Sequence, residues 1–184
     1  MALQTKSFIV MVISLCLGGL IGEWLHIEDG MNHLGLMLEQ RFARGNQHFA
    51  EGFVTATLIA VIGAMGILGA IQAGVSGDNT TLYTKSVMDG FMAIMLTASL
   101  GVGVIFSALP VIIYQGTITL FASFLVQFVP KALMTNALRE IGAVGGLMIL
   151  GIGLNLMGIT KIRISNLLPG LLVLVAILTG QYFL

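Results

Sequence analysis

Charged residues are scarce in this chain of 184 residues, where Lys, Arg, Asp and Glu together make up 9%. A soluble domain carries about 25% charged residues, so this chain has too few to cover a surface that faces water. Hydrophobic residues account for 57% of the chain, and the mean hydropathy is +1.02. The scarcity of charge excludes an ordinary soluble domain and predicts an all-α, polytopic membrane protein.

Other absences narrow the classes of function. The formal net charge is zero, so the basic surface of a nucleic-acid-binding protein is missing and we expect no nucleic-acid partner. The single cysteine, Cys16, cannot form an internal disulfide. No phosphate-binding loop of the Walker type occurs, and the predicted spans contain no histidine, so neither an ATP-driven motor nor an intramembrane hydrolase is expected. We therefore expect no enzyme and no cofactor.

All three histidines fall in one acidic connector, as His26, His33 and His48. Histidine and carboxylate side chains at helical spacing could hold a metal ion, but no recognised metal-binding spacing is present. A hydrated polar loop is therefore favoured over a metal site.

Charge-free runs predict about six spans, because a helix needs about 20 apolar residues to cross a bilayer. One run is long enough for two spans, with Leu109-Pro110 as the expected break, since proline interrupts helical hydrogen bonding. Two amphipathic stretches, Met31–Arg44 and Lys131–Glu140, are predicted to be short interfacial helices, with polar connectors as the alternative. The runs lie in one membrane domain, 1–184, at residues 7–22 (extending past Glu23 to 25), 52–75, 90–130, 141–160 and 164–184.

The order of elements repeats, which predicts one repeat at about 6–108 and a second at about 109–184. Gly63-Ala64-Met65-Gly66 resembles Gly142-Ala143-Val144-Gly145 in the corresponding position. Because each half holds three spans, the two halves must have opposite orientations in the membrane. Inverted three-helix repeats are typical of secondary transporters, although some channels have them too.

Several phrases of the sequence are characteristic when taken together: Leu17-Gly18-Gly19-Leu20-Ile21-Gly22-Glu23, residues 66–74, Lys85-Ser86 with Asp89-Gly90, Tyr114-Gln115-Gly116 and Asn166-Leu167-Leu168-Pro169. Together they resemble a bacterial membrane family, the YqgA-like proteins of domain of unknown function 554. The resemblance covers nearly the whole chain and implies an inner-membrane protein, often described as a transport protein, without an established substrate. Similar members usually carry further hydrophobic sequence before this segment, which favours a shortened N-terminus here.

Asp89 is the first candidate functional residue, because an ionisable group inside a span is costly and usually faces a polar cavity or partner. The alternative is a local Lys85–Asp89 pair near the membrane surface. Other polar side chains in or beside the spans could contact a solute, although bonding between helices is the simpler role for each. The candidate solute or ion pathway comprises Asp89, Lys85, Ser86, Gln72, Asn155, Ser165, Asn166 and Gln115.

The favoured function is a secondary transporter or facilitator of a small polar or anionic solute. A channel and a non-transporting scaffold or regulatory protein remain alternatives. The expected partners are the lipid bilayer, the solute and further copies of the chain, because small-xxx-small patterns suit close helix packing. The sequence has four such patterns: Gly18-xxx-Gly22, Ala70-xxx-Gly74, Ser99-xxx-Gly103 and Gly142-xxx-Gly146. Lysine and arginine divide four against four between the two sides, so the positive-inside rule does not decide the orientation.

Overall fold

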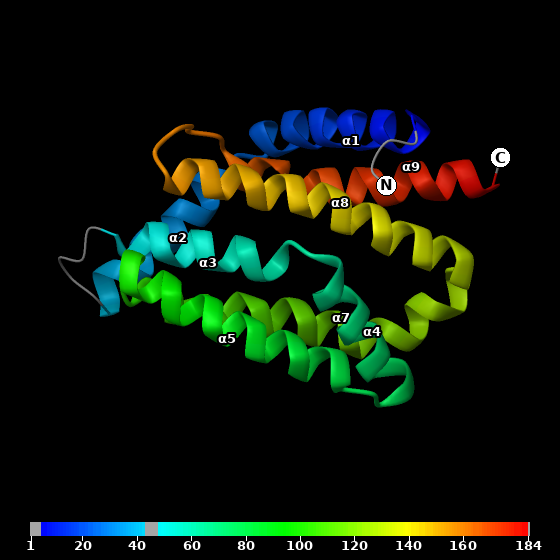
Figure 1. Cartoon of the computed structure of the whole chain (residues 1–184), viewed down its shortest axis with the longest axis horizontal. Coiled ribbons are helices and arrows are strands. Elements are labelled where there is room, and N and C mark those ends of the chain that lie inside the picture. Colours follow the sequence, from blue (N-terminus) through cyan, green and yellow to red (C-terminus); the bar gives the residue numbers. More distant parts are fainter. Residues whose placement is uncertain (1–4, 43–47, 184) are drawn as a thin grey trace. The chain divides into compact units, whose positions relative to one another are not determined.

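The all-α class is confirmed by the computed structural model of the chain, which describes residues 5–42 and 48–183 (Figure 1). The regular structure of these residues is entirely helical. The helices are α1 (Thr5–Trp24), α2 (Ile27–Phe42), α3 (Phe49–Val61), α4 (Ala64–Ser76), α5 (Thr80–Leu100), α6 (Gly103–Phe106), α7 (Ala108–Phe128), α8 (Lys131–Leu156), the 3₁₀ turn η1 (Ile164–Leu167) and α9 (Pro169–Phe183). Arg44, the predicted end of an interfacial helix, lies outside the described residues.

Three helical segments in the described part of the chain are long and apolar enough to cross a membrane. They are Gly103–Phe124, Lys131–Leu156 and Ile164–Tyr182. The number rises to five if the pairs α1–α2 and α3–α4 each form one broken span. Six spans arranged as inverted repeats therefore remain a prediction.

The run predicted as one span over 52–75 consists of two helices, α3 and α4, that are bent by 62° at a short break. Gly63 lies in the break with a φ of +153°, a backbone conformation that side-chain-bearing residues rarely adopt. Hydrophobicity is continuous across the break, so the sequence pattern did not reveal it.

The predicted break at Leu109-Pro110 is wrong. The chain turns earlier, after α5, where Gly101 has a φ of +77°. Pro110 lies in the first turn of α7, where a missing backbone N–H costs nothing because the helix has no acceptor for it.

A separate interfacial helix over Lys131–Glu140 is also wrong. These residues form the first part of α8, which continues without interruption to Leu156. At 1.5 Å per residue this helix is roughly 39 Å long, and its length exceeds the hydrocarbon thickness of about 30 Å. The polar residues that suggested an interfacial helix therefore lie on an extension of the span.

The chain divides into two compact units, and the first contains α1, α8, η1 and α9. In this unit α1 runs alongside α9 (Figure 1). The backbones touch where Gly18 meets Gly170, and Gly22 lies against the backbone of Asn166, so a Cβ atom at either glycine would overlap the opposite chain. The predicted Gly18-xxx-Gly22 face thus packs helices within the unit.

The second unit contains most of α2 together with α3 to α7. Two further small-residue patterns pack helices here, because Gly74 of α4 touches Thr119 of α7 and Gly103 of α6 touches Phe49 of α3. Phe49 is fully buried and packs against Phe106 in a tilted arrangement, with ring centroids 5.2 Å apart. The units are not the two predicted repeats, since each draws on both halves of the sequence.

Large apolar side chains point outward along several helices. Exposed examples on α5 include Phe91, Ile94 and Met95, and on α7 they include Leu120 and Phe121. Monomeric soluble proteins rarely expose continuous apolar surface on this scale, whereas lipid chains are the natural solvent for it. The exposed surface therefore agrees with the membrane class that composition predicts.

Candidate functional site

A cavity of about 440 Å³ lies within the second unit, between α3, α5, α6 and α7. Its walls are mainly apolar and include Ala56 and Ile59 of α3 and Ile112 of α7. Four of the predicted pathway residues also line it: Lys85, Ser86, Asp89 and Gln115. The structure therefore gathers half of the predicted set around one cavity.

Lys85 and Asp89 form an ion pair one helical turn apart on α5. The lysine side chain is only 10% exposed, whereas the aspartate side chain is 37% exposed. The buried member of the pair is thus the cation, and the carboxylate lies on the more open side.

The structure places this pair within a helix, farther from the start of the helix than the sequence pattern indicated. The sequence pattern placed Asp89 at the start of a span, but α5 begins at Thr80 and ends at Leu100. Asp89 is therefore about 14 Å along the helix axis at 1.5 Å per residue, close to the middle of α5. Among the described helices, α5 is not one of those long and apolar enough to cross a membrane. The pair is notable because its cation is buried in the wall of the cavity, where a charge is costly without a partner.

Gln115 of α7 brings a second hydrogen-bond donor to the cavity. Its Nε2 atom is buried and has no hydrogen-bond partner. Buried polar atoms without a partner are rare and costly, so each needs an explanation. Gly66 of α4 explains how the polar groups come together, because a Cβ atom there would lie 3.0 Å from Lys85 Cε and 3.1 Å from Gln115 Nε2.

The fifth predicted residue of this unit, Gln72, is not among those lining the cavity. Its Oε1 atom accepts a hydrogen bond of 2.6 Å from the Thr81 hydroxyl, which joins the end of α4 to the start of α5. The role of Gln72 in the structure is therefore to hold the turn between these helices.

The remaining predicted residues, Asn155, Ser165 and Asn166, lie in the first unit. Asn155 closes the loop after α8, where its amide donates to the Ile162 carbonyl and its Oδ1 accepts from the Ile162 N–H and the Thr160 hydroxyl. The same side chain thus satisfies three groups of a loop, as structural asparagines often do.

Asn166 is the centre of a polar network that sequence analysis did not anticipate. Its Oδ1 accepts a 2.8 Å hydrogen bond from the Glu28 N–H, and its amide donates to Glu23. The carboxylate of Glu28 accepts from the Ser165 N–H at 3.0 Å, and Arg163 donates to Glu23 at 2.8 Å. These partners are about 140 residues apart in sequence, so no local spacing could have revealed them.

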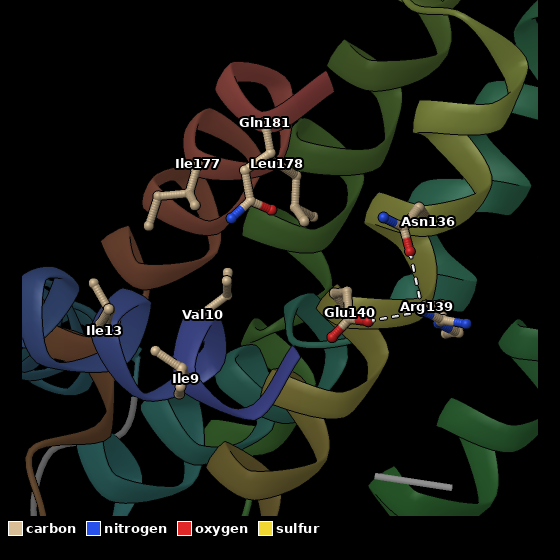
Figure 2. A pocket seen from close by; sticks show the side chains of 9 residues that line it. All are labelled: Ile9, Val10, Ile13, Asn136, Arg139, Glu140, Ile177, Leu178 and Gln181. Carbon is tan, nitrogen blue, oxygen red and sulfur yellow. Dashed lines mark hydrogen bonds and ion pairs between the residues drawn. The ribbon is translucent and has the colours of Figure 1, made fainter. Parts of the chain in front are cut away.

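A second cavity, of about 620 Å³, lies within the first unit (Figure 2). One side is apolar, with Ile9, Val10 and Ile13 of α1, and the other carries polar groups of α8. Glu140 is buried there, with its carboxylate 3.1 Å from the guanidinium of Arg139, which also donates to Asn136. The sequence pattern placed Asn136, Arg139 and Glu140 in an interfacial helix and gave no sign of a cavity.

No group of three or more His, Cys, Asp and Glu side chains that could hold a metal ion occurs in the part of the chain that the structure describes.

Comparison with known proteins gives the family. The family model described as "Protein of unknown function (DUF554)" matches residues 1–179. This chain belongs to the DUF554 family. The resemblance seen in the sequence phrases is thereby confirmed.

Two relatives support the assignment to this family. "Uncharacterized membrane protein YdfK" of Bacillus subtilis (strain 168) is 39% identical over 170 residues, which cover 92% of this chain and 70% of that protein. "Uncharacterized protein YqgA" of Escherichia coli (strain K12) is 32% identical over 167 residues, covering 88% of this chain and 69% of that protein. No solved structure matches this DUF554 chain. Family, composition and apolar helices together support association with the membrane.

Proposed function

We propose that this DUF554 protein is a secondary transporter or facilitator of a small polar or anionic solute. The observation that carries the proposal is the cavity of the second unit, where Lys85, Asp89, Ser86 and Gln115 meet among apolar helices. Polar and charged groups at such places usually mark the path of a substrate or an ion. Concave sites with few polar groups on apolar walls are also the usual form of small-molecule sites.

The break between α3 and α4 supports the same proposal. Discontinuous helices are a recurring feature of secondary transporters, where they frame the solute site. Ala56, Ile59 and Ala60 on α3 line the cavity just before the break. This step rests on analogy between folds.

The proposal includes the predicted setting of the protein. It would be a multi-pass protein of the bacterial inner membrane, built from inverted repeats, acting as a homo-oligomer and without enzymatic activity. Three of the four small-residue patterns in the sequence already pack helices within the units, so an oligomer would have to use other surfaces.

Solute exchange in proteoliposomes tests the proposal. The chain and its Asp89→Asn variant are reconstituted side by side, and uptake of a mixed metabolite pool is followed by mass spectrometry. We expect the wild type to take up at least one solute with saturation and counterflow, and the variant to lose that uptake. Asp78→Asn is the matched control, because Asp78 is an exposed carboxylate in the turn before α5.

Each outcome has a distinct meaning. If Asp89→Asn leaves uptake and its pH dependence unchanged, charge coupling through Asp89 is wrong. Flux without saturation or counterflow would replace the carrier by a channel. If folded wild-type protein moves no solute of the pool, transport is rejected in favour of a scaffold or regulatory role.

A further inference from the structure

We infer that the cavity of the second unit binds a small organic carboxylate, whose anionic group replaces Asp89 as the partner of Lys85 while Asp89 takes up a proton. The inference deepens the proposed transport function, because it names the substrate class and the coupling ion of the same site. It rests on the charge, burial and hydrogen bonding of three side chains.

Lys85 carries the positive charge that would attract the ligand. Lys85 is the buried member of its ion pair, and its ammonium group has three N–H donors. An ammonium group removed from water needs an anionic partner, which Asp89 supplies in the structure. Asp89 is more than a third exposed and can turn toward the open side of the cavity, since the rotamers of such a side chain interconvert readily. A carboxylate that enters the cavity can therefore take its place.

Gln115 offers a second hydrogen-bond donor to the ligand. The buried Nε2 atom of this residue has no partner, and it lies beside Lys85 across Gly66. A carboxylate has two oxygens and accepts several hydrogen bonds. One oxygen can receive the lysine N–H while the other receives the glutamine N–H, which would satisfy the unpaired donor.

The apolar lining of the cavity suits the carbon chain of the ligand. The rest of the lining is mainly aliphatic, with Ile59, Leu96, Val111 and Ile112 among the larger side chains. Apolar surface removed from water favours binding by about 25 cal/mol per Å². The cavity therefore suits a short carbon chain behind the carboxylate better than a bare inorganic anion or a sugar.

Charge balance in the cavity requires a proton to accompany the bound anion. Lys85 and Asp89 are neutral together, and α3, α4, α6 and α7 contribute no other titratable side chain to the lining. A bound monoanion leaves two negative charges against one positive charge in an apolar surrounding, which is unfavourable. A proton from the aqueous phase that binds an Asp89 carboxylate oxygen restores neutrality. The bound state then holds one anion and one additional proton, which corresponds to proton-coupled carboxylate transport.

Calorimetric titration of the full chain in detergent with sodium butyrate tests the inference. Titrations in two buffers of different ionisation enthalpy report the protons exchanged, and we expect uptake of about one proton per butyrate bound. Butyramide, which has nearly the same shape without the charge, should bind at least roughly tenfold more weakly, because it cannot form a charge-assisted hydrogen bond.

Variants assign the effect to residues. Asp89→Asn should bind butyrate without proton uptake, so its affinity should no longer rise as the pH falls. Lys85→Met should abolish binding, whereas Lys161→Met, at an exposed lysine of the loop after α8, should not. If Lys85→Met fails to fold, the double variant Lys85→Met/Asp89→Asn removes both charges together, and it should also fail to bind. Gln115→Met should weaken binding roughly tenfold by removing one donor.

Several results would overturn the inference: no butyrate binding to the folded wild type, equal binding of butyramide, binding retained without Lys85, or proton uptake retained in Asp89→Asn. The result is separable from that of the transport experiment. Butyrate binding without uptake into proteoliposomes would leave the site assignment intact and reject transport. Uptake of other solutes without butyrate binding would support transport and reject the site assignment.

Discussion

The contact between α1 and α9 makes a quantitative prediction for Gly18→Ala. A Cβ atom at this position would overlap the backbone of Gly170 and lie 3.1 Å from the Pro169 carbonyl carbon. Backbone atoms cannot rotate out of the way, and carbon atoms in contact need about 3.5–4.0 Å. The substitution therefore forces the two helices apart on the order of 1 Å.

The expected magnitude follows from two opposing terms. Overpacking of a well-packed contact typically costs about 1–3 kcal/mol, and the upper end applies here because both sides are backbone. Alanine offsets up to about 1 kcal/mol of this cost through its higher helix propensity. We therefore expect Gly18→Ala to lower the free energy of unfolding by about 2 kcal/mol.

Gly19→Ala is the matched control on the same helix. A Cβ atom there would meet only the Leu167 Cδ2 atom, at 3.2 Å, and this is the end of a flexible side chain. We expect this variant to differ from the wild type by less than about 1 kcal/mol. Both are measured by denaturant titration in detergent micelles with circular dichroism. Equal stability of the two variants would refute the backbone contact between α1 and α9.

Three further predictions concern the polar groups and the cavity. A double-mutant cycle with Lys85→Met and Asp89→Asn should give a coupling energy of about 1 kcal/mol in chemical unfolding, kept small by the partial exposure of the aspartate; purely additive losses would contradict the ion pair. Asn166→Ala should lower stability by about 2 kcal/mol, because two glutamates lose a partner, and an unchanged thermal melt would contradict the network. Gly66→Ala should fold normally but slow solute uptake roughly tenfold by displacing the polar side chains. Gly116→Ala, at a glycine without neighbours within 4 Å, should leave uptake unchanged.

The sequence predicted the helical class and the start and end of several helices, because continuous hydrophobicity requires internal hydrogen bonding of the backbone. The Lys85–Asp89 pair, which the i,i+4 spacing gave as the alternative to a coupling role for Asp89, is present in the structure, since that spacing brings side chains together on any helix. What the sequence pattern misjudged was their position along the helix. Residues 80–84 are polar and looked like a connector, but they continue α5.

Breaks in helices were harder to predict than the helices themselves. Pro110 suggested a break, but proline is tolerated in the first turn of a helix. The unpredicted turns are at Gly63 and Gly101, where the backbone adopts positive φ. The chain has 24 glycines, and in the described residues Gly77 and Gly158 also have positive φ just after helices, so composition alone could not identify the glycines at which helices break.

Hydrogen bonds distinguish the polar residues that hold loops and helices together from those that can bind a solute. In the first unit, Asn155 and Asn166 bond to loop and glutamate groups, so their hydrogen-bonding capacity is largely used. Ser165 has an unpaired hydroxyl there, but it lines neither of the two cavities described. In the second unit, Gln115 has an unpaired donor beside a cavity and next to a buried lysine. A donor without a partner is costly in a folded protein, and a ligand that accepts its hydrogen bond removes that cost. This difference, rather than the polarity of the residues, is why the proposed solute site lies between α3, α5 and α7.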